Sequence, residues 1–215
     1  MNYKVLYRKY RPKTFDEIVG QNNIITLLKD SIINNKISHA YIFSGPRGTG
    51  KTSTAKIFAK AINCLDNTDG NPCLNCEICS NFNLNNDIYE IDAASNTGVD
   101  QIREIIDNVK LSPITSKYKV YIIDEVHMLS TSAFNALLLT LEEPPSHVVF
   151  ILATTNIEDV PITVLSRCQR LDFRKIANKD IHEQLKKVSN EENIDISDEA
   201  IEEITNYSDG GMRDA

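Results

Sequence analysis

The stretch at positions 45–52 constrains the fold of this chain more than any other part of its sequence. It has the pattern G-x-x-x-x-G-K-[ST] and consists of Gly45, Pro46, Arg47, Gly48, Thr49, Gly50, Lys51 and Thr52. Residues 40–44 before it read as a short buried strand, and residues 53–63 after it read as a helix with an apolar face. A strand that enters a helix through such a turn is typical of the phosphate-binding loop of nucleoside triphosphatases. The alternative is an ordinary glycine-rich turn, against which the flanking strand and helix argue.

The chemistry of this phosphate loop suits a nucleotide. The turn leaves backbone N–H groups at a helix N-terminus unpaired and aimed at one point, where the helix dipole adds positive potential. Gly48 and Gly50 allow backbone angles that a Cβ would forbid, so the backbone can wrap an anion. Lys51 can reach the β- and γ-phosphates, and the Thr52 hydroxyl can ligate Mg²⁺. We therefore predict a site for ATP and Mg²⁺.

Hydrophobic patterning places the loop in a parallel sheet. The predicted strands are residues 40–44, 88–92, 119–123, 148–154 and 169–173. They alternate with helices and read as apolar on both faces, which indicates an α/β fold with a parallel sheet covered on both sides. From about residue 174 the pattern is helical only, with helices predicted at 179–192 and 198–208. We expect a nucleotide-binding domain at 1–175 and a helical domain at 176–215.

A second candidate site follows the strand predicted at 119–123. Asp124 and Glu125 are adjacent carboxylates at its C-terminal end, the edge at which ligands bind in open α/β sheets. Asp124 would hold Mg²⁺, directly or through water, and Glu125 would polarise the attacking water. Two acids after a strand are a weak signal alone, but an intact phosphate loop in the same sheet makes the pair a strong one.

A third candidate site is a cysteine module at about residues 64–86. Its ligands would be Cys64, Cys73, Cys76 and Cys79, spaced C-x8-C-x2-C-x2-C in a stretch rich in Asn, Asp and Gly. Four thiolates at this spacing suit tetrahedral coordination of a structural Zn²⁺ ion. The alternatives are an iron–sulfur cluster, a disulfide pair or unrelated thiols. The upstream fourth cysteine argues against the cluster, and a cytoplasmic location argues against a disulfide.

Composition limits the location and the partners of the chain. It is 41% hydrophobic and 25% charged, which is the range of soluble globular proteins. It has neither an apolar run of about 20 residues nor a signal-peptide-like start, so we expect a cytoplasmic protein with no membrane partner. A net charge of -7 means that any DNA contact must come from a local patch or from several subunits. The basic cluster near the start, either a solvated arm or a phosphate contact, is Lys4, Arg8, Lys9, Arg11 and Lys13.

Further short motifs run along the whole chain. They are Tyr7-Arg8-Lys9-Tyr10-Arg11-Pro12, Val19-Gly20-Gln21, Leu141-Glu142-Glu143-Pro144-Pro145, Ala153-Thr154-Thr155, Leu165-Ser166-Arg167-Cys168 and Arg213-Asp214-Ala215. With the phosphate loop and the four cysteines, they resemble the gamma/tau family of bacterial DNA polymerase III clamp-loader ATPases, within the AAA+ superfamily. The complete phosphate loop argues against the related delta-prime-like subunits, in which it is typically degraded.

The resemblance implies a fold and a set of residue roles. The fold is an AAA+ sheet of five parallel strands in the order 5-1-4-3-2, followed by a helical lid domain. Family members continue further, so the lid at 176–215 is expected to be incomplete. Thr155 would be the polar sensor beside the γ-phosphate, and Arg213 the lid sensor. Arg167 would be an arginine finger for a neighbouring subunit's ATP, although its spacing alone fits a solvated arginine equally well. The base and ribose would lie beside Tyr7, Arg8, Arg11, Pro12 and Val19.

The activity that the resemblance implies is ATP hydrolysis by one subunit of a hetero-oligomeric ring, in which other clamp-loader subunits are its partners. The ring would open a sliding clamp and place it on primed DNA, and this subunit would transfer no nucleotides itself. Two alternatives stay open. One is a nucleotide-binding scaffold subunit that does not hydrolyse ATP. The other is a different AAA+ DNA motor, such as a branch-migration helicase, against which the cysteine module argues.

Overall fold

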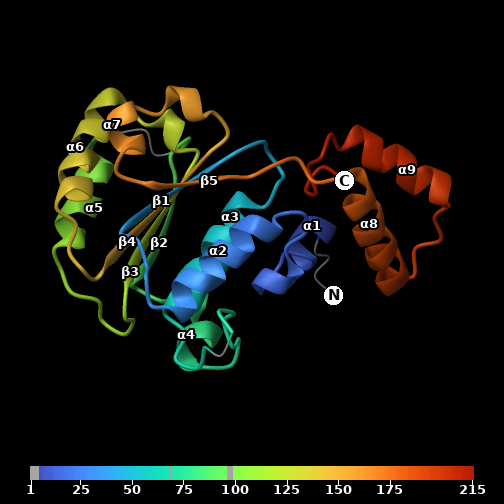
Figure 1. Cartoon of the computed structure of the whole chain (residues 1–215), viewed down its shortest axis with the longest axis horizontal. Helices are drawn as coiled ribbons and strands as arrows, with labels where there is room; N and C mark the ends of the chain where they lie inside the picture. Colours follow the sequence, from blue (N-terminus) through green and yellow to red (C-terminus); the bar gives the residue numbers. More distant parts are fainter. Residues whose placement is uncertain (1–4, 68, 96–98) are drawn as a thin grey trace.

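A computed structural model of the chain describes residues 5–67, 69–95 and 99–215, and Figure 1 shows their arrangement. In these ranges the strands are β1 (Ala40–Ser44), β2 (Ile88–Asp92), β3 (Lys119–Asp124), β4 (Val148–Thr154) and β5 (Gln169–Asp172). They form one parallel sheet in the order β2-β3-β4-β1-β5. Read from the other edge, this is the order 5-1-4-3-2. The predicted fold class is confirmed.

Helices cover the sheet on both faces, as Figure 1 shows. One face is covered by α2 (Asn22–Ile33) and α3 (Lys51–Ile62), and the other by α5 (Val99–Val109) and α6 (Thr131–Glu142). Successive residues of β4 alternate between the two apolar layers, because strand side chains point to opposite faces in turn. Ile151 packs in the layer under α2 and α3, whereas Phe150 and Leu152 pack under α5 and α6.

The two edge strands correct one expectation. The sequence predicts strands that are apolar on both faces, but β2 exposes Glu90 and β5 exposes Arg170 and Asp172. Each of these strands has a strand neighbour on one side only, so water reaches its other side. Polar side chains at an exposed edge also prevent pairing with another chain.

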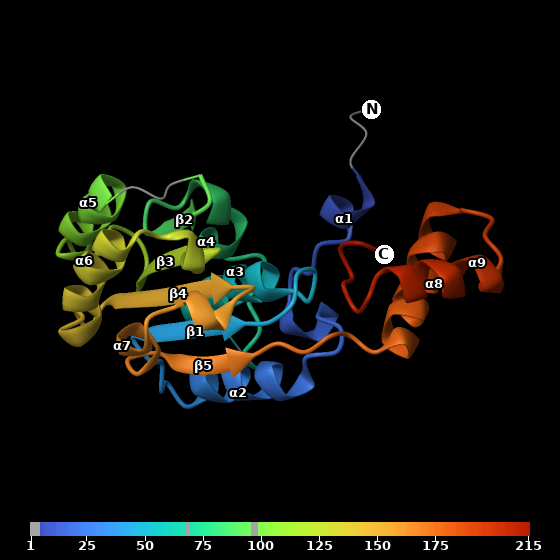
Figure 2. The ribbon, with the colours of Figure 1, turned by 90° about the horizontal axis from the view of Figure 1, so that it is seen from above.

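The remaining helices are short or lie after the sheet. The described short helices are α1 (Leu6–Lys9), α4 (Glu77–Ser80) and α7 (Ile162–Leu165). After β5 the chain forms α8 (Asn178–Glu192) and α9 (Asp198–Tyr207). Ser197 caps the start of α9, because its hydroxyl accepts the Ala200 N–H at 3.2 Å. Figure 2 shows α8 and α9 at the end of the sheet to which the strands point, near α1. The division into two domains stays a prediction.

None of the helices in the described part of the chain is both long enough and apolar enough to cross a membrane.

Candidate functional site

The phosphate loop joins β1 to α3 at the carboxyl end of the sheet, as predicted. Two of its glycines are required by close neighbours. Gly45 has φ +142°, and a Cβ there would lie 2.3 Å from the carbonyl oxygen of Phe173. Gly48 has φ +77°, and a Cβ there would lie 2.9 Å from the Cα of Gly211. The loop is therefore held between the segment that follows β5 and the turn that follows α9.

Lys51 is buried inside the loop, with only 6% of its surface exposed. Its ammonium donates to the carbonyl oxygens of Gly45 at 2.7 Å and Pro46 at 2.8 Å. Burial lowers the pKa of Lys51, and the nearby carboxylates of Glu125 and Asp124 partly oppose this shift. The cation is thus held at the N-terminus of α3, where backbone N–H groups favour an anion, and this arrangement fits phosphate.

The two residues assigned to Mg²⁺ are in direct contact. Thr52, in the first turn of α3, donates its hydroxyl to the Oδ2 of Asp124 at 2.6 Å, and Asp124 ends β3. The other carboxylate oxygen of Asp124 accepts the N–H of Glu125 at 3.0 Å. Hydroxyl and carboxylate oxygens are the ligands that a hard cation such as Mg²⁺ prefers, so this pair fits the ion.

Glu125 is held by polar neighbours from the ends of two adjacent strands, since Thr155 follows β4 and His127 lies in the turn after β3. The backbone of Glu125 is left-handed at φ +48°, a conformation that costs a non-glycine residue about 1–2 kcal/mol. Its carboxylate accepts the Thr155 hydroxyl at 3.0 Å, and the Nδ1 of His127 lies 3.4 Å from its Oε2. The same Nδ1 lies 3.0 Å from the Oγ1 of Thr154. His127 had no predicted role, and its only signal in the sequence was a polar ring in the turn that follows the two acids.

The loop and the two acids face a cleft of about 510 Å³, a size typical of small-molecule sites. Four of the five residues predicted to lie beside the base and ribose line this cleft: Tyr7, Arg11, Pro12 and Val19. Arg8 does not line it and instead donates its Nε–H to the Tyr7 hydroxyl at 3.2 Å. Arg213 also lines the cleft, with its Cζ 5.2 Å from the centroid of the Tyr7 ring. The hydrogen bond from Arg8 to the Tyr7 hydroxyl and the positive charge of Arg8 lower the pKa of Tyr7.

The N-terminal basic cluster is only partly a solvated arm. Lys9 forms an ion pair with Glu192 of α8, which also accepts the hydroxyl of Tyr10 at 2.6 Å. These contacts attach the segment around α1 to α8. Lys4 lies outside the described residues.

Arg167 lies away from the cleft, in the turn after α7. Its Nη2 donates to the Oε1 of Glu142 at 2.5 Å, and its Nη1 donates to the Thr163 carbonyl at 2.7 Å. Of the five predicted catalytic residues, all of which the structure describes, Arg167 is the one that it does not bring near the phosphate loop or Glu125. Its action on a neighbouring subunit stays a prediction.

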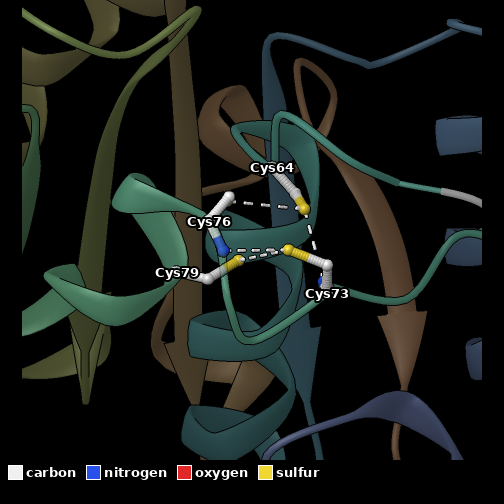
Figure 3. A group of neighbouring side chains, drawn as sticks. All are labelled: Cys64, Cys73, Cys76 and Cys79. Atoms are coloured by element: carbon white, nitrogen blue, oxygen red, sulfur yellow. Dashed lines mark hydrogen bonds between the residues drawn. The ribbon is translucent and has the colours of Figure 1, made fainter.

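The four cysteines of the module converge, as Figure 3 shows, although residue 68 of this segment lies outside the described residues. All four sulfur atoms lie within 4.8 Å of one another. The Cys64–Cys76 and Cys73–Cys79 sulfur pairs are each 3.9 Å apart, far beyond the S–S bond length of about 2.0 Å, so these thiols are not bridged. Tetrahedral zinc with Zn–S bonds of about 2.3 Å places sulfurs about 3.8 Å apart. The donor set fits zinc.

Backbone N–H groups stabilise negative charge on these sulfurs. The Sγ of Cys64 accepts the N–H of Cys73 at 3.3 Å, and the Sγ of Cys73 accepts the N–H of Cys76 at 3.2 Å. For Cys76, burial raises the pKa, but hydrogen bonds from the Leu65 and Cys79 N–H groups outweigh it and lower the pKa to about 6. Burial raises the pKa of Cys79. One thiolate is therefore readily available near neutral pH for binding a metal.

The sequence of the chain matches a known family and several curated proteins. The sequence profile of the family described as DNA polymerase III, delta subunit, matches residues 20–177. The whole chain is 52% identical to the DNA polymerase III subunit tau of Bacillus subtilis, of which it covers 38%. It is 47% identical to the subunit tau/gamma of Haemophilus influenzae and 45% to the subunit tau of Escherichia coli, of which it covers 32% and 34%. The chain spans about a third of the length of these curated relatives.

Solved structures share the fold. The RuvB Holliday junction branch migration motor of Thermotoga maritima has a TM-score of 0.68 at 24% identity, over 95% of this chain and 62% of that one. A DNA polymerase III gamma subunit-related protein of Thermotoga maritima has a TM-score of 0.58 at 23% identity, over 75% of this chain and 48% of that one. The sequence matches confirm the resemblance to the gamma/tau subunits. With its profile match and its similarity to tau and gamma subunits, this chain belongs to the DNA polymerase III, delta subunit, family.

Proposed function

We propose that this chain is the ATP-hydrolysing part of a DNA polymerase III clamp-loader subunit. It acts in a hetero-oligomeric ring that loads a sliding clamp onto primed DNA. The observation that carries the proposal is the 2.6 Å contact between Thr52 and Asp124, with Lys51 and Glu125 lining the same cleft. A subunit that only binds nucleotide needs the phosphate loop, whereas one that hydrolyses it also needs a carboxylate placed to activate water.

Each part of the cleft has a role in this proposal. The N–H groups of the phosphate loop and Lys51 bind the β- and γ-phosphates, and Thr52 and Asp124 hold Mg²⁺, which neutralises developing charge. Glu125 accepts a proton from the water that attacks the γ-phosphorus, while the bond to the bridging oxygen breaks and ADP takes its electron pair. Thr155, whose hydroxyl bonds to Glu125, orients that carboxylate.

Other predicted residues act at the borders of the site. Tyr7 and Arg11 contact the base side of the nucleotide, and Arg213 is the lid sensor. Arg167 stabilises the transition state in a neighbouring subunit. The four cysteines hold structural zinc and take no part in hydrolysis.

Steady-state ATPase measurements on the full-length protein with sliding clamp and primed DNA test the proposal. We expect hydrolysis that clamp and DNA stimulate. Lys51→Ala should abolish nucleotide binding, because it removes the cation that faces the phosphates. Lys56→Ala is the matched control, since Lys56 lies on the same helix but pairs with Glu90, with 2.6 Å between Nζ and Oε2. ATP binding without hydrolysis, in the presence of clamp and DNA, would support the scaffold alternative instead.

A further inference from the structure

Gln21 is a buried side chain that joins the phosphate loop to the segment leading from β5 to α8. It is 4% exposed and does not line the cleft. Its amide nitrogen donates to the carbonyl of Arg174 at 2.7 Å and, more weakly, to that of Thr49 at 3.4 Å. Its amide oxygen accepts the N–H of Arg174 at 3.2 Å. A primary amide can donate and accept at once, so Gln21 binds Arg174 as a neighbouring strand would.

The segment after β5, residues 173–176, packs tightly on both sides of Gln21. Gly45 of the phosphate loop lies against the carbonyl of Phe173, where a Cβ would be only 2.3 Å away. Gly20, the residue before Gln21, lies against Ile176, where a Cβ would be 3.1 Å from the Cγ2 atom. Closely packed interiors transmit displacement. A shift of this segment must therefore move the phosphate loop or break these contacts.

The same segment also contacts the turn after α9. The N–H of Ile176 donates to the carbonyl of Gly210 at 3.0 Å. The next residue, Gly211, approaches the phosphate loop at Gly48, where a Cβ would be 2.9 Å from its Cα. The loop, the segment and the turn thus form a closed ring of contacts. In that ring, Gln21 is the side chain that joins the loop to the segment.

We propose that Gln21 is a positioning residue that couples the phosphate loop to helices α8 and α9. Phosphate groups bound in the loop fix the carbonyl of Thr49, and Gln21 passes this constraint to Arg174 and so to the start of α8. Conversely, a movement of α8 changes the loop through the same bonds. This coupling deepens the proposed function and rests on it for the identity of the ligand, because ATP supplies the phosphate groups.

Hydrogen exchange of backbone amides in the full-length protein tests the coupling. Gln21→Met keeps a side chain of similar length but loses the donor and the acceptor. Without ATP, it should speed exchange by about tenfold in both residues 45–52 and residues 173–178, which corresponds to about 1.4 kcal/mol. With ATP, the unaltered protein should gain protection in both segments, whereas Gln21→Met should gain it in residues 45–52 only. Asn22→Ala, at the exposed neighbouring position, should behave like the unaltered protein.

Three other outcomes are possible, two of which overturn the coupling by Gln21 and one of which contradicts the proposed function. Gln21→Met that matches the unaltered protein in both arms overturns the coupling, because packing alone then explains the site. Exchange that rises equally in β3 and β4 also overturns it, because the variant is then generally unstable. An unaltered protein that gains no protection from ATP contradicts the proposed function, while the ATP-free arm still decides the role of Gln21. Should Gln21→Met fail to fold, Gln21→Asn, which keeps an uncharged amide but is one methylene too short to reach Arg174 in the same way, replaces it in both arms.

Discussion

The nucleotide-binding cleft and the cysteine module are built in opposite ways. In the cleft, the backbone of the sheet sets the position of each group: the phosphate loop ends β1, and Asp124 ends β3. In the described part of the module, regular structure is limited to the one-turn helix α4 and a 3-10 turn at Phe82–Leu84. The apolar side chains of Leu65 and Leu84 are 71% and 81% exposed, so they form no core of their own.

The two sites therefore require different things from their ligands. The cleft holds Lys51 on the carbonyls of its own loop, and it holds Asp124 and Glu125 on the hydroxyls of Thr52 and Thr155, so hydrogen bonds within the chain set these positions. Among the module residues that the structure describes, Ile78 is the one large apolar side chain that is buried, which is little to set against the conformational entropy of its loops. We therefore expect a metal ion to organise the module, whereas the fold itself organises the cleft.

Removal of the metal is expected to have the largest effect and tests the comparison directly. Structural zinc contributes roughly 10 kcal/mol or more to the folding of small modules of this kind. Chelation, or Cys73→Ser with Cys76→Ser, should unfold residues 64–86 while ATP still binds. Elemental analysis should find one zinc per chain, and Cys168→Ser, which lies outside the module, should not change that content. Iron, or a folded sample without metal, would contradict this expectation.

Replacement of Arg167 is expected to have the next largest effect. An arginine finger accelerates phosphoryl transfer by about 10³–10⁵. In the assembled full-length protein, Arg167→Ala should slow hydrolysis by that factor and leave ATP affinity unchanged, because Arg167 does not line the cleft of its own chain. Arg170→Ala is the control, since Arg170 pairs with Asp172, with 2.7 Å between Nε and Oδ1. An isolated chain that hydrolyses ATP as fast as the assembly would show that the cleft needs no residue from a neighbour.

Glu125→Gln should change hydrolysis and leave the shape of the cleft intact. General-base catalysis contributes about 10²–10⁴ to a rate, and the amide cannot accept the proton of the attacking water. We expect an ATPase rate lower by that factor with an unchanged dissociation constant for ATP. Glu143→Gln, at an exposed position after α6, is the matched control. Normal hydrolysis by Glu125→Gln in an assembled loader would refute the role of this residue as the base.

Replacement of Asp87 is expected to have a smaller effect. Its carboxylate is held by backbone N–H groups, as a bound anion would be. Asp87 is fully buried, and its carboxylate accepts the N–H groups of Ile114, Thr115 and Ser116 at 2.7–2.8 Å. Burial raises the pKa of Asp87, but these N–H groups outweigh that effect and hold the pKa below its ordinary value. Asp87→Asn should therefore lower the free energy of unfolding by about 1–3 kcal/mol at pH 7.

The pH dependence of that loss follows from the direction of the shift. A carboxyl with a lowered folded-state pKa stabilises the fold above its unfolded-state pKa of about 3.9, and this stabilisation disappears as pH falls through the folded-state value. Urea unfolding of the unaltered protein and of Asp87→Asn should thus differ most at neutral pH and converge below about pH 3.9. A difference that stays constant down to pH 3 would mean that the charge of Asp87 contributes nothing.

Local sequence patterns predicted the strands of the sheet and the strand and helix that flank the phosphate loop. The strand at residues 148–154 has its predicted bounds, and the phosphate loop lies between a strand and a helix as its pattern indicates. The four-residue helices α1, α4 and α7 were missed, because a single turn shows no hydrophobic period. The bond between Gln21 and Arg174 joins residues 153 positions apart, and no pattern near either residue reports such a contact. The ion pair of Arg167 with Glu142 was missed for the same reason.

The position of β1 in the sheet determines how long this strand stays unpaired while the ribosome makes the protein. Among the described residues, the strand that carries the phosphate loop pairs with β4 and β5, which are translated roughly 100 to 130 residues later. At about 5–20 residues per second, β1 waits on the order of 5–20 s with both edges free. Its five residues are all buried in the finished protein. During that interval the nascent chain therefore exposes an unpaired, largely apolar strand, which can pair with other chains. The strand that carries the phosphate loop is made early in translation, but its pairing in the sheet cannot be completed until residue 172 has left the ribosome.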